Sequence, residues 1–359
     1  MANTEFIDEQ LVTFMLFYAS AGVVMSTLGA VGNTIVIKTF TSMGLIDGVT
    51  ASLLVLSFAD LIFLIARLCR AVSAGLMAFE VIRQYLVWFS VDPTALHFYF
   101  AHVGHIFYTY IITITTFLAI ARCMCVLKPV NFKYVFTTHM SLLILGGSLV
   151  FCVVSLCPIF AFMGITTSFD ERINATRGML LIVPGRELAR HITRGIRDIG
   201  LAVPSQVIVV ICVVIKIRCL KASSKFRHRS HLGSMTNMSL VQVFQSSVMS
   251  LSCEGFVLHK EPIPAVSNTR SPKLSSKDLN AVRQIFLISV VFITCNSPKI
   301  IMTIAGFQMP ELSLGGTLEN IFMCLNWLTD LFQIINASAG LIIYYKYNSK
   351  FRKTLCPIK

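Results

Sequence analysis

Long apolar runs alternate with short polar segments along the whole chain. A helix that crosses the hydrocarbon of a bilayer needs about 20 mostly apolar residues, and several of these runs are longer than that. Each run contains at most one formally charged residue, and the pattern predicts an all-α membrane protein, a seven-transmembrane helix bundle. The predicted spans are residues 11–37, 49–66, 93–121, 140–169, 199–215, 284–307 and 320–345.

The composition agrees with this interpretation. Only 13% of the residues are charged and 55% are hydrophobic, whereas soluble proteins carry about 25% charged residues. The mean hydropathy is +0.75. This composition excludes a disordered chain and disfavours an ordinary soluble enzyme. Many of the 11 cysteines lie in or beside the apolar runs, which is not the pattern of a small secreted disulfide scaffold.

The distribution of charge predicts the orientation in the membrane. Basic residues are concentrated after the fifth span and in the C-terminal tail, whereas the N-terminal tail is acidic. Because cytoplasmic loops carry an excess of basic residues, we expect a multi-pass plasma-membrane protein with an extracellular N-terminus. The predicted regions are an extracellular tail (1–10), spans one to five (11–218), a long and largely disordered cytoplasmic third loop (219–280), spans six and seven (281–345) and a cytoplasmic tail (346–359).

The loop between spans four and five departs from this trend, because it is basic although it should lie outside. It contains six arginines, from Arg172 to Arg197, against four acidic residues. Two interpretations remain open: the arginines attract an anionic ligand to the mouth of the bundle, or they belong to a solvated hairpin. In the same loop, Asn174 begins an Asn-Ala-Thr triplet, the acceptor pattern for N-glycosylation on the outside face.

Asp60 lies near the middle of the second span, where a carboxylate without partners is costly. The candidates for its partners are Asn33 in the first span and Asn336 in the seventh. The alternative is a protonated aspartic acid packed in a polar network. Either way, the position predicts a polar cluster inside the bundle.

Polar or proline anchors recur in the spans in a fixed order. They are Gly32-Asn33, Leu56 to Asp60, Ala121-Arg122-Cys123 followed by Val126 and Pro129, Pro158, Pro204, Phe292 with Cys295 to Pro298, and Asn336 followed by Gly340 to Tyr344. In this order the set resembles the rhodopsin-like (class A) G-protein-coupled receptors over nearly the whole chain. The resemblance implies a seven-helix bundle, and Phe351 and Arg352 follow at the spacing of that family's short amphipathic eighth helix.

The resemblance also implies roles for these residues. Four residues at the cytoplasmic side would serve coupling to a heterotrimeric G protein: Arg122, Val126, Pro129 and Tyr344. Five would repack on activation: Ile112, Pro204, Phe292, Asn296 and Pro298. Three would hold a sodium ion in the inactive state: Asn33, Asp60 and Asn336. The alternatives are an interfacial arginine at Arg122 and plain core packing for the activation residues.

The chain departs from the family pattern at several anchors. Ala121 replaces the acid that restrains Arg122, which predicts raised basal activity because one inactive-state ion pair is missing. Asn296 replaces the usual tryptophan of the sixth span. The cysteine pair that joins the third span to the following outer loop is also missing, so no such disulfide fixes that loop. Cys356 in the C-terminal tail is a candidate for palmitoylation, with a free thiol as the alternative.

Seven titratable residues fall in the outer halves of the predicted spans, where this architecture places the ligand: Arg67, Arg70, His102, His105, Arg197, Lys299 and Asp330. Lys299 follows the Pro298 kink and should face the bundle, and Asp330 should pair with Lys299 or Arg70. The surplus is basic, which favours a small anionic molecule or a peptide as ligand. The alternative is that these charges only neutralise one another. Gly104 stands where amine receptors carry an aspartate, which disfavours a biogenic amine.

A narrower resemblance is to the chemosensory receptor branch of gastropod molluscs, and it rests on residues 88–93, 119–126 and 296–299. This branch shares much with invertebrate neuropeptide receptors of the FMRFamide type. We therefore expect a chemosensory G-protein-coupled receptor, with a neuropeptide receptor as the alternative. A transporter or channel is a remote alternative, because no internal repeat is visible. We do not expect an enzyme, because His102 and His105 have no intramembrane acid to complete a metal site. We also expect no nucleic-acid partner.

Overall fold

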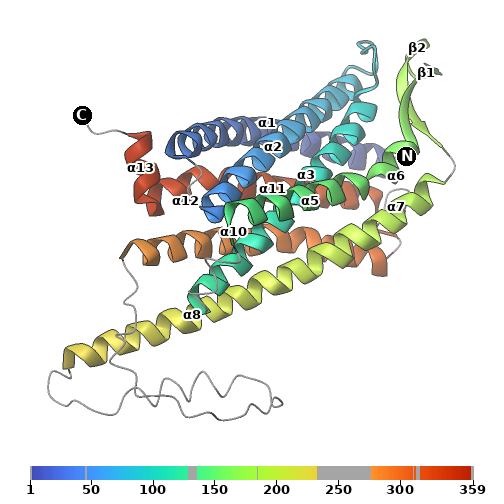
Figure 1. The fold of residues 1–359 in the computed structure, drawn as a ribbon. Helices are drawn as coiled ribbons and strands as arrows, with labels where there is room; N and C mark the ends of the chain where they lie inside the picture. Colours follow the sequence, from blue (N-terminus) through green and yellow to red (C-terminus); the bar gives the residue numbers. More distant parts are fainter. Residues whose placement is uncertain are drawn as a thin grey trace. The chain divides into compact units, whose positions relative to one another are not determined.

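The computed structural model describes residues 2–44, 47–127, 136–183, 185–232, 276–309, 311–312 and 316–356 (Figure 1). The chain divides into two compact units. The first consists of Met1–Lys216 together with Asn280–Lys359, and the second of Ile217–Leu279. The helices are α1 (Ala2–Met43), α2 (Gly48–Ile82), α3 (Pro93–Leu127), α5 (Thr138–Val154), α6 (Cys157–Ala161), α7 (Arg186–Arg194), the π-helix η1 (Gly195–Leu201), α8 (Ala202–Leu232), α10 (Ser276–Gln308), α11 (Glu319–Ser338), α12 (Gly340–Tyr347) and α13 (Ser349–Leu355). The strands are β1 (Met163–Asp170) and β2 (Ala175–Ile182).

Six helices in the described residues are long and apolar enough to cross a membrane, as expected of a membrane-embedded protein. Large apolar side chains stay exposed on them, such as Leu28 at 68%, Val150 at 63% and Ile301 at 65%. Such surface is unfavourable in water but is matched by lipid chains. The six segments are Glu9–Met43, Gly48–Ile82, Pro93–Cys125, Thr138–Ala161, His191–Arg218 and Arg283–Gln308.

The seventh predicted span, 320–345, is divided between α11 and α12 at Ala339. α11 is not among the six apolar helices, because polar side chains such as Asp330 and Gln333 occupy its buried face. The seven-helix bundle therefore stays a prediction. α13 lies where the eighth helix is expected, with Phe351 buried and Arg352 exposed, and its role as an amphipathic membrane helix also stays a prediction.

The fourth predicted span is too long, and the all-α prediction is incomplete. The helical part ends at Ala161, and residues 163–169 form most of β1, which pairs antiparallel with β2 from Met163 opposite Ile182 to Asp170 opposite Ala175. β-branched residues of this stretch, such as Ile165 and Thr166, suit a strand. An uncharged run does not distinguish a helix from a short strand that follows it.

Side-chain caps fix where three helices begin. Asp47 Oδ1 accepts a hydrogen bond of 2.6 Å from the Thr50 backbone N–H at the start of α2, and Thr137 Oγ1 accepts one of 3.3 Å from Met140 N–H at the start of α5. Asp92, which directly precedes α3, accepts a hydrogen bond of 2.9 Å through its Oδ1 from the N–H of Thr94 in the first turn of that helix. Each cap satisfies a backbone donor that the helix leaves unpaired, and each helix begins within two residues of its predicted start.

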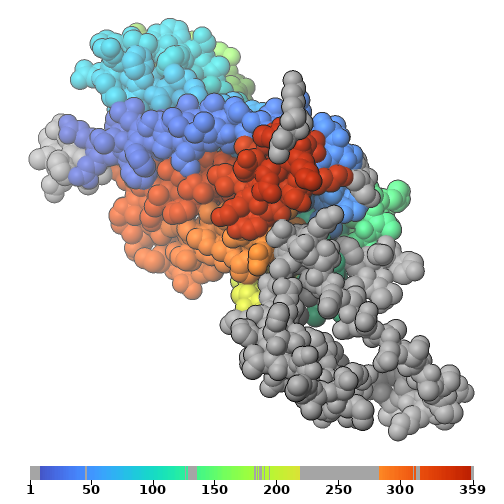
Figure 2. All heavy atoms as spheres, turned by 90° about the vertical axis from the view of Figure 1, so that its left-hand side faces the viewer, coloured from blue at the N-terminus to red at the C-terminus, as the bar shows by residue number. Residues whose placement is uncertain are grey.

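α2 is the central helix of the first unit, and α1, α3, α5 and α11 pack against it. Small residues allow the closest approach: a Cβ placed on Gly22 of α1 would lie only 2.9 Å from the Cβ of Ala71 in α2. Figure 2 shows the C-terminal helices in red beside α1 in blue. There the Phe40 ring lies 5.2 Å from the ring of Tyr344 and 5.3 Å from that of Phe351.

Most of the predicted third loop lies outside the described residues, which omit 233–275. Within the predicted 219–280 segment, α8 continues to Leu232 and α10 begins at Ser276. At the other end of the chain, α1 begins at Ala2, so the described part of the predicted tail 1–10 is helical. The orientation of the N-terminus relative to a membrane stays a prediction.

Candidate functional site

A small inner cavity lies where two of the predicted motifs meet, Leu56 to Asp60 and Asn336 to Tyr344. Its volume is about 20 Å³, which is room for about one water molecule or a small ion. Its walls come from α2, α3, α10, α11 and α12, together with the break at Ala339. The lining residues include Leu56, Asp60, Thr115, Ile288, Asn336 and Tyr344. Residues up to 288 positions apart in sequence therefore border one space.

Asp60 and Asn336 both border this cavity, and Asp60 is buried with its Oδ1 lacking a hydrogen-bond partner. Asn33 contributes differently from the prediction. Its Nδ2 donates hydrogen bonds to the carbonyls of Gly29 at 3.0 Å and Ala337 at 2.9 Å. Asn33 thus fastens α1 to the end of α11, while Asp60 and Asn336 supply the polar walls.

The oxygen atoms around this cavity fit a small hard cation. Hard cations prefer carboxylate, amide and hydroxyl oxygens, and Asp60, Asn336 and Thr115 offer these groups. Among the described residues, no group of three or more histidine, cysteine, aspartate or glutamate side chains is arranged to hold a metal. The donor set therefore fits a monovalent ion such as sodium better than a transition metal.

A second polar group is centred on Asp330, which is completely buried in α11. Its Oδ1 lies 3.1 Å from Arg67 Nη1, and its Oδ2 is paired with Arg70 Nη1. Arg67 also donates a hydrogen bond of 2.7 Å to Gln333 Oε1. The sequence left open whether Asp330 pairs with Lys299 or Arg70, and the structure pairs it with Arg70 and, in addition, with Arg67. We call Arg67, Arg70 and Asp330 the charged triad.

Aromatic residues enclose the charged triad on the side of α1. Arg70 Nε donates a hydrogen bond of 3.2 Å to His97 Nε2, and Trp327 Nε1 donates one of 3.4 Å to the same atom. The Tyr18 ring stacks on Trp327 with the centroids 5.7 Å apart. Sequence reasoning missed His97 and Trp327, although a histidine and a tryptophan in apolar spans usually need a polar partner.

Gly104 gives the charged triad room against α3. A Cβ at this position would lie 3.4 Å from Arg67 Nε, so the guanidinium lies across the glycine. The Arg67 Cζ also lies 4.9 Å from the centre of the Phe63 ring, a cation–π contact. The position where amine receptors carry an aspartate is therefore occupied by a glycine that contacts the Arg67 guanidinium, and the class of ligand stays a prediction.

The remaining predicted pocket residues form a second group beside the charged triad. Lys299 Nζ donates a hydrogen bond of 2.8 Å to Asn326 Oδ1. Arg197 pairs with its neighbour Asp198, with Nε 2.5 Å from Oδ1. The His102 and His105 rings are 6.4 Å apart. His105 interacts electrostatically with Arg197, Arg67, Lys299 and His102, so the structure brings the predicted pocket residues together.

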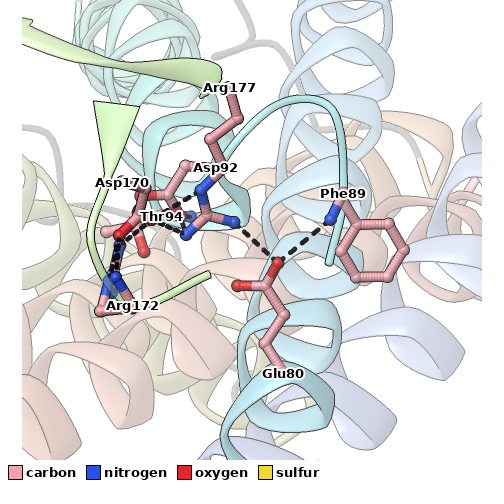
Figure 3. A network of polar contacts seen from close by, with 7 residues as sticks. All are labelled: Glu80, Phe89, Asp92, Thr94, Asp170, Arg172 and Arg177. Atoms are coloured by element: carbon pink, nitrogen blue, oxygen red, sulfur yellow. Dashed lines mark hydrogen bonds and ion pairs between the residues drawn. The ribbon is translucent and has the colours of Figure 1, made fainter. Parts of the chain in front are cut away.

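A third polar group attaches the β-hairpin to the helices (Figure 3). Arg177 of β2 is completely buried and pairs with Glu80 near the end of α2 at 2.8 Å and with Asp170 of β1 at 2.7 Å. Arg172 pairs with Asp170 at 2.9 Å and with Asp92 at 3.5 Å. We call these five residues the hairpin clamp.

Backbone hydrogen bonds strengthen the hairpin clamp. The N–H of Asp92 donates to the carbonyl of Gly178 at 2.8 Å, and the N–H of Gly178 donates to the carbonyl of Ser90 at 3.0 Å. Phe89 N–H donates to Glu80 Oε1 at 3.3 Å. The hairpin is thus tied to the connection between α2 and α3 without a disulfide. Two of the loop's arginines, Arg172 and Arg177, are committed to ion pairs, which favours the hairpin interpretation of this loop.

Sequence reasoning missed the acidic half of the hairpin clamp. Glu80 is the only acidic residue between Asp60 and Asp92, and its burial at the end of an apolar helix is a signal that a basic partner lies nearby. Asn174, the predicted glycosylation position, is exposed at the hairpin turn with a left-handed φ of 49°. Its glycosylation stays a prediction.

The opposite end of α3 carries the predicted coupling residues. Arg122 is half-buried and its Nε has no hydrogen-bond partner, while the neighbouring Ala121 is completely buried. Tyr344 is buried and shares a hydrogen bond with Ser57. The side chain of Val126 and all of Pro129 lie outside the described part of the structure, so their predicted roles stay untested.

Three of the predicted activation residues lie in the core, and one does not. Ile112, Phe292 and Asn296 are buried, and Asn296 Nδ2 donates a hydrogen bond of 2.9 Å to the carbonyl of Phe292. Pro298 lies inside α10. Pro204 is exposed on α8. Cys356 is an exposed free thiol at the end of α13, and its palmitoylation stays a prediction.

Replacing Arg177 by methionine should strongly destabilise the protein. The change leaves the buried Glu80 without the arginine that pairs with it, and breaking a buried pair in this way costs about 3 to 5 kcal/mol. It also removes one of the two arginines that pair with Asp92 and Asp170. The control is Arg172→Met, because the Arg172 side chain is 44% exposed and exposed pairs contribute about 1 kcal/mol or less. Thermal unfolding of the detergent-solubilised protein measures both losses. Equal losses would contradict the role assigned to Arg177.

The contribution of Asp170 should depend on pH. Hydrogen bonding to Arg172 and then to Arg177 lowers the pKa of Asp170 to about 2, below the value of about 3.9 for an unfolded chain. The stabilisation is therefore complete above about pH 4 and is lost as the pH falls toward 2. The difference in melting temperature between the natural protein and Asp170→Asn should shrink over this range. A difference that stays constant would refute this assignment.

No protein-family model matches the chain, and no curated protein is significantly similar to it in sequence. The resemblance to rhodopsin-like receptors therefore rests on the motif residues of the sequence.

Proposed function

We propose that the chain is a rhodopsin-like G-protein-coupled receptor of the plasma membrane, and that it senses an external chemical ligand. The observation that carries this proposal is the inner cavity. Motif residues from helices far apart in the sequence, among them Asp60, Asn336 and Tyr344, border one small polar space. A carboxylate inside an apolar bundle is costly for stability and usually serves function.

The arrangement of the last helices supports the seven-span architecture within this proposal. α11 and α12 together supply the seventh span, and the bend at Ala339 lies against the inner cavity. α13 then follows as the amphipathic eighth helix, because Asn348 caps it and its buried Phe351 packs on Phe40 and Tyr344. The N-terminus would lie outside and α13 inside the cell, in line with the basic tail.

The proposed mechanism is a shift between two populations of the bundle. A ligand that binds the active arrangement more tightly moves the equilibrium toward it. Arg122 has no acid beside it in α3, because Ala121 occupies that position and is buried. One restraint on the inactive state is therefore missing, and the receptor should show activity without ligand.

Arg122→Ala should abolish most of this ligand-independent activity, because it removes the cation that contacts the G protein. The measurement is G-protein activation in cells, normalised to receptor at the surface. Arg83→Ala is the matched control, since Arg83 is an exposed arginine at the far end of α2. Activity that survives in Arg122→Ala at normal surface expression would exclude the proposed role of Arg122.

Sodium should stabilise the protein through Asp60. An ion that binds only the folded state raises its stability, so replacing sodium by choline should lower the melting temperature of the natural protein. Asp60→Asn should melt at the same temperature in both salts, because the carboxylate ligand is gone. An equal effect of sodium on both proteins would place the ion elsewhere.

A further inference from the structure

The buried polar region at the hairpin end of the bundle carries an excess of positive charge. Among the side chains that the structure describes, its basic residues are Arg67, Arg70, Arg197 and Lys299, and its acidic residues are Asp198 and Asp330. Four positive charges thus face two negative ones. An uncompensated buried charge is costly, so this excess indicates a place where a negative group binds.

The two acids of the region do not neutralise this excess of positive charge. Asp330 is completely buried and already bonded to both Arg67 and Arg70, and Asp198 is bonded to Arg197 through both of its carboxylate oxygens. Each acid of the region therefore has a close arginine partner. Asp330, the acid predicted as a partner of Lys299, is instead bonded to arginines.

Lys299 is the cation that remains with a neutral partner. Its one hydrogen bond among the described residues is to the amide oxygen of Asn326, and its side chain is only half-buried. Two further donors in this region are buried without a hydrogen-bond partner, Arg67 Nε and Arg197 Nη1. Donors in this state form strong hydrogen bonds with a carboxylate when one is supplied.

We propose that Lys299, Asn326 and Arg197 bind the carboxylate of the receptor's ligand beside His105. This inference rests on the proposed receptor function and adds the chemical class of the ligand. Lys299 contributes the direct ion pair, and Asn326 holds the ammonium group in position. The charged triad contributes a fixed positive field from the closed side of the site.

This chemistry separates acids from amides. A small organic acid, or a peptide with a free terminal carboxylate, supplies the missing negative charge. An amidated peptide of the same sequence does not, because its terminus is neutral and cannot form an ion pair with Lys299 in direct contact. The site therefore favours an acid ligand over the amidated peptides expected for the alternative receptor type.

The test uses the purified full chain in detergent and follows thermal unfolding. The probes are dicarboxylic acids of four to six carbons, each beside its diamide, and one tripeptide in its free-acid and amidated forms. An acid of at least one of the two sources should raise the melting temperature, and its matched amide should not. Stabilisation by the dicarboxylic acids alone or by the free-acid peptide alone identifies the source of the carboxylate.

Variants assign the effect to Lys299. Lys299→Met should weaken the binding of the acid at least about tenfold, because a charged hydrogen bond is lost. Lys299→Arg retains the charge and should retain most of the binding. Lys346→Met is the control, since Lys346 is an exposed lysine near the end of α12. A normal melting temperature without ligand shows that each variant is folded.

Three results would overturn the inference: no acid stabilises the protein, acid and amide stabilise it equally, or Lys299→Met binds the acid as well as the natural protein. The failure of the receptor proposal looks different. Acid binding that depends on Lys299 without activation of any G protein would keep the site and reject the receptor function. G-protein activation without acid binding would keep the receptor and reject the ligand class.

Discussion

A charge buried inside an apolar bundle is costly unless it is paired, and Asp330 is paired with Arg67 and Arg70. The acid is completely buried and lies 3.1 Å from Arg67. The pairing holds α11 against α2, the helix on which most of the unit packs. It also orders the surrounding groups, because Arg70 donates to His97 and His97 accepts from Trp327. Loss of the acid would leave two buried guanidinium groups without their carboxylate partner, which would destabilise the folded protein.

The same constraint shapes both sides of the charged triad. At the hairpin, buried Arg177 gathers three carboxylates and ties β2 to α2 and α3 in the absence of a disulfide. Toward α10, the commitment of Asp330 to two arginines leaves Lys299 with a neutral amide. The ion pairs of Arg177 thus hold the β-hairpin on the helices, and the ion pairs of Asp330 leave Lys299 available to bind an acidic group.

The sequence predicted the parts of this fold that depend on local pattern. Apolar runs located six of the predicted helices, because exclusion of charge from lipid acts residue by residue. The strand β1 was assigned to a helix, since its pairing with β2 lies outside its own sequence. Asp330 and Glu80 pair with arginines of other elements that are distant in sequence. Spacing along the chain therefore left the partner of Asp330 open and did not identify the partner of Glu80. Asp60 and Asn336 border one cavity, and their role in holding a sodium ion stays a prediction.

The proposed function of this bundle is activation of a G protein. Nucleotide exchange on purified G proteins, one class at a time, in membranes that contain the chain, measures this activity directly. We expect exchange by at least one class to rise above that in membranes without the chain, even before ligand is added, because Arg122 lacks an acidic restraint. Exchange that stays at the background for every class, together with an ion current that needs no ligand, would contradict the proposed receptor function.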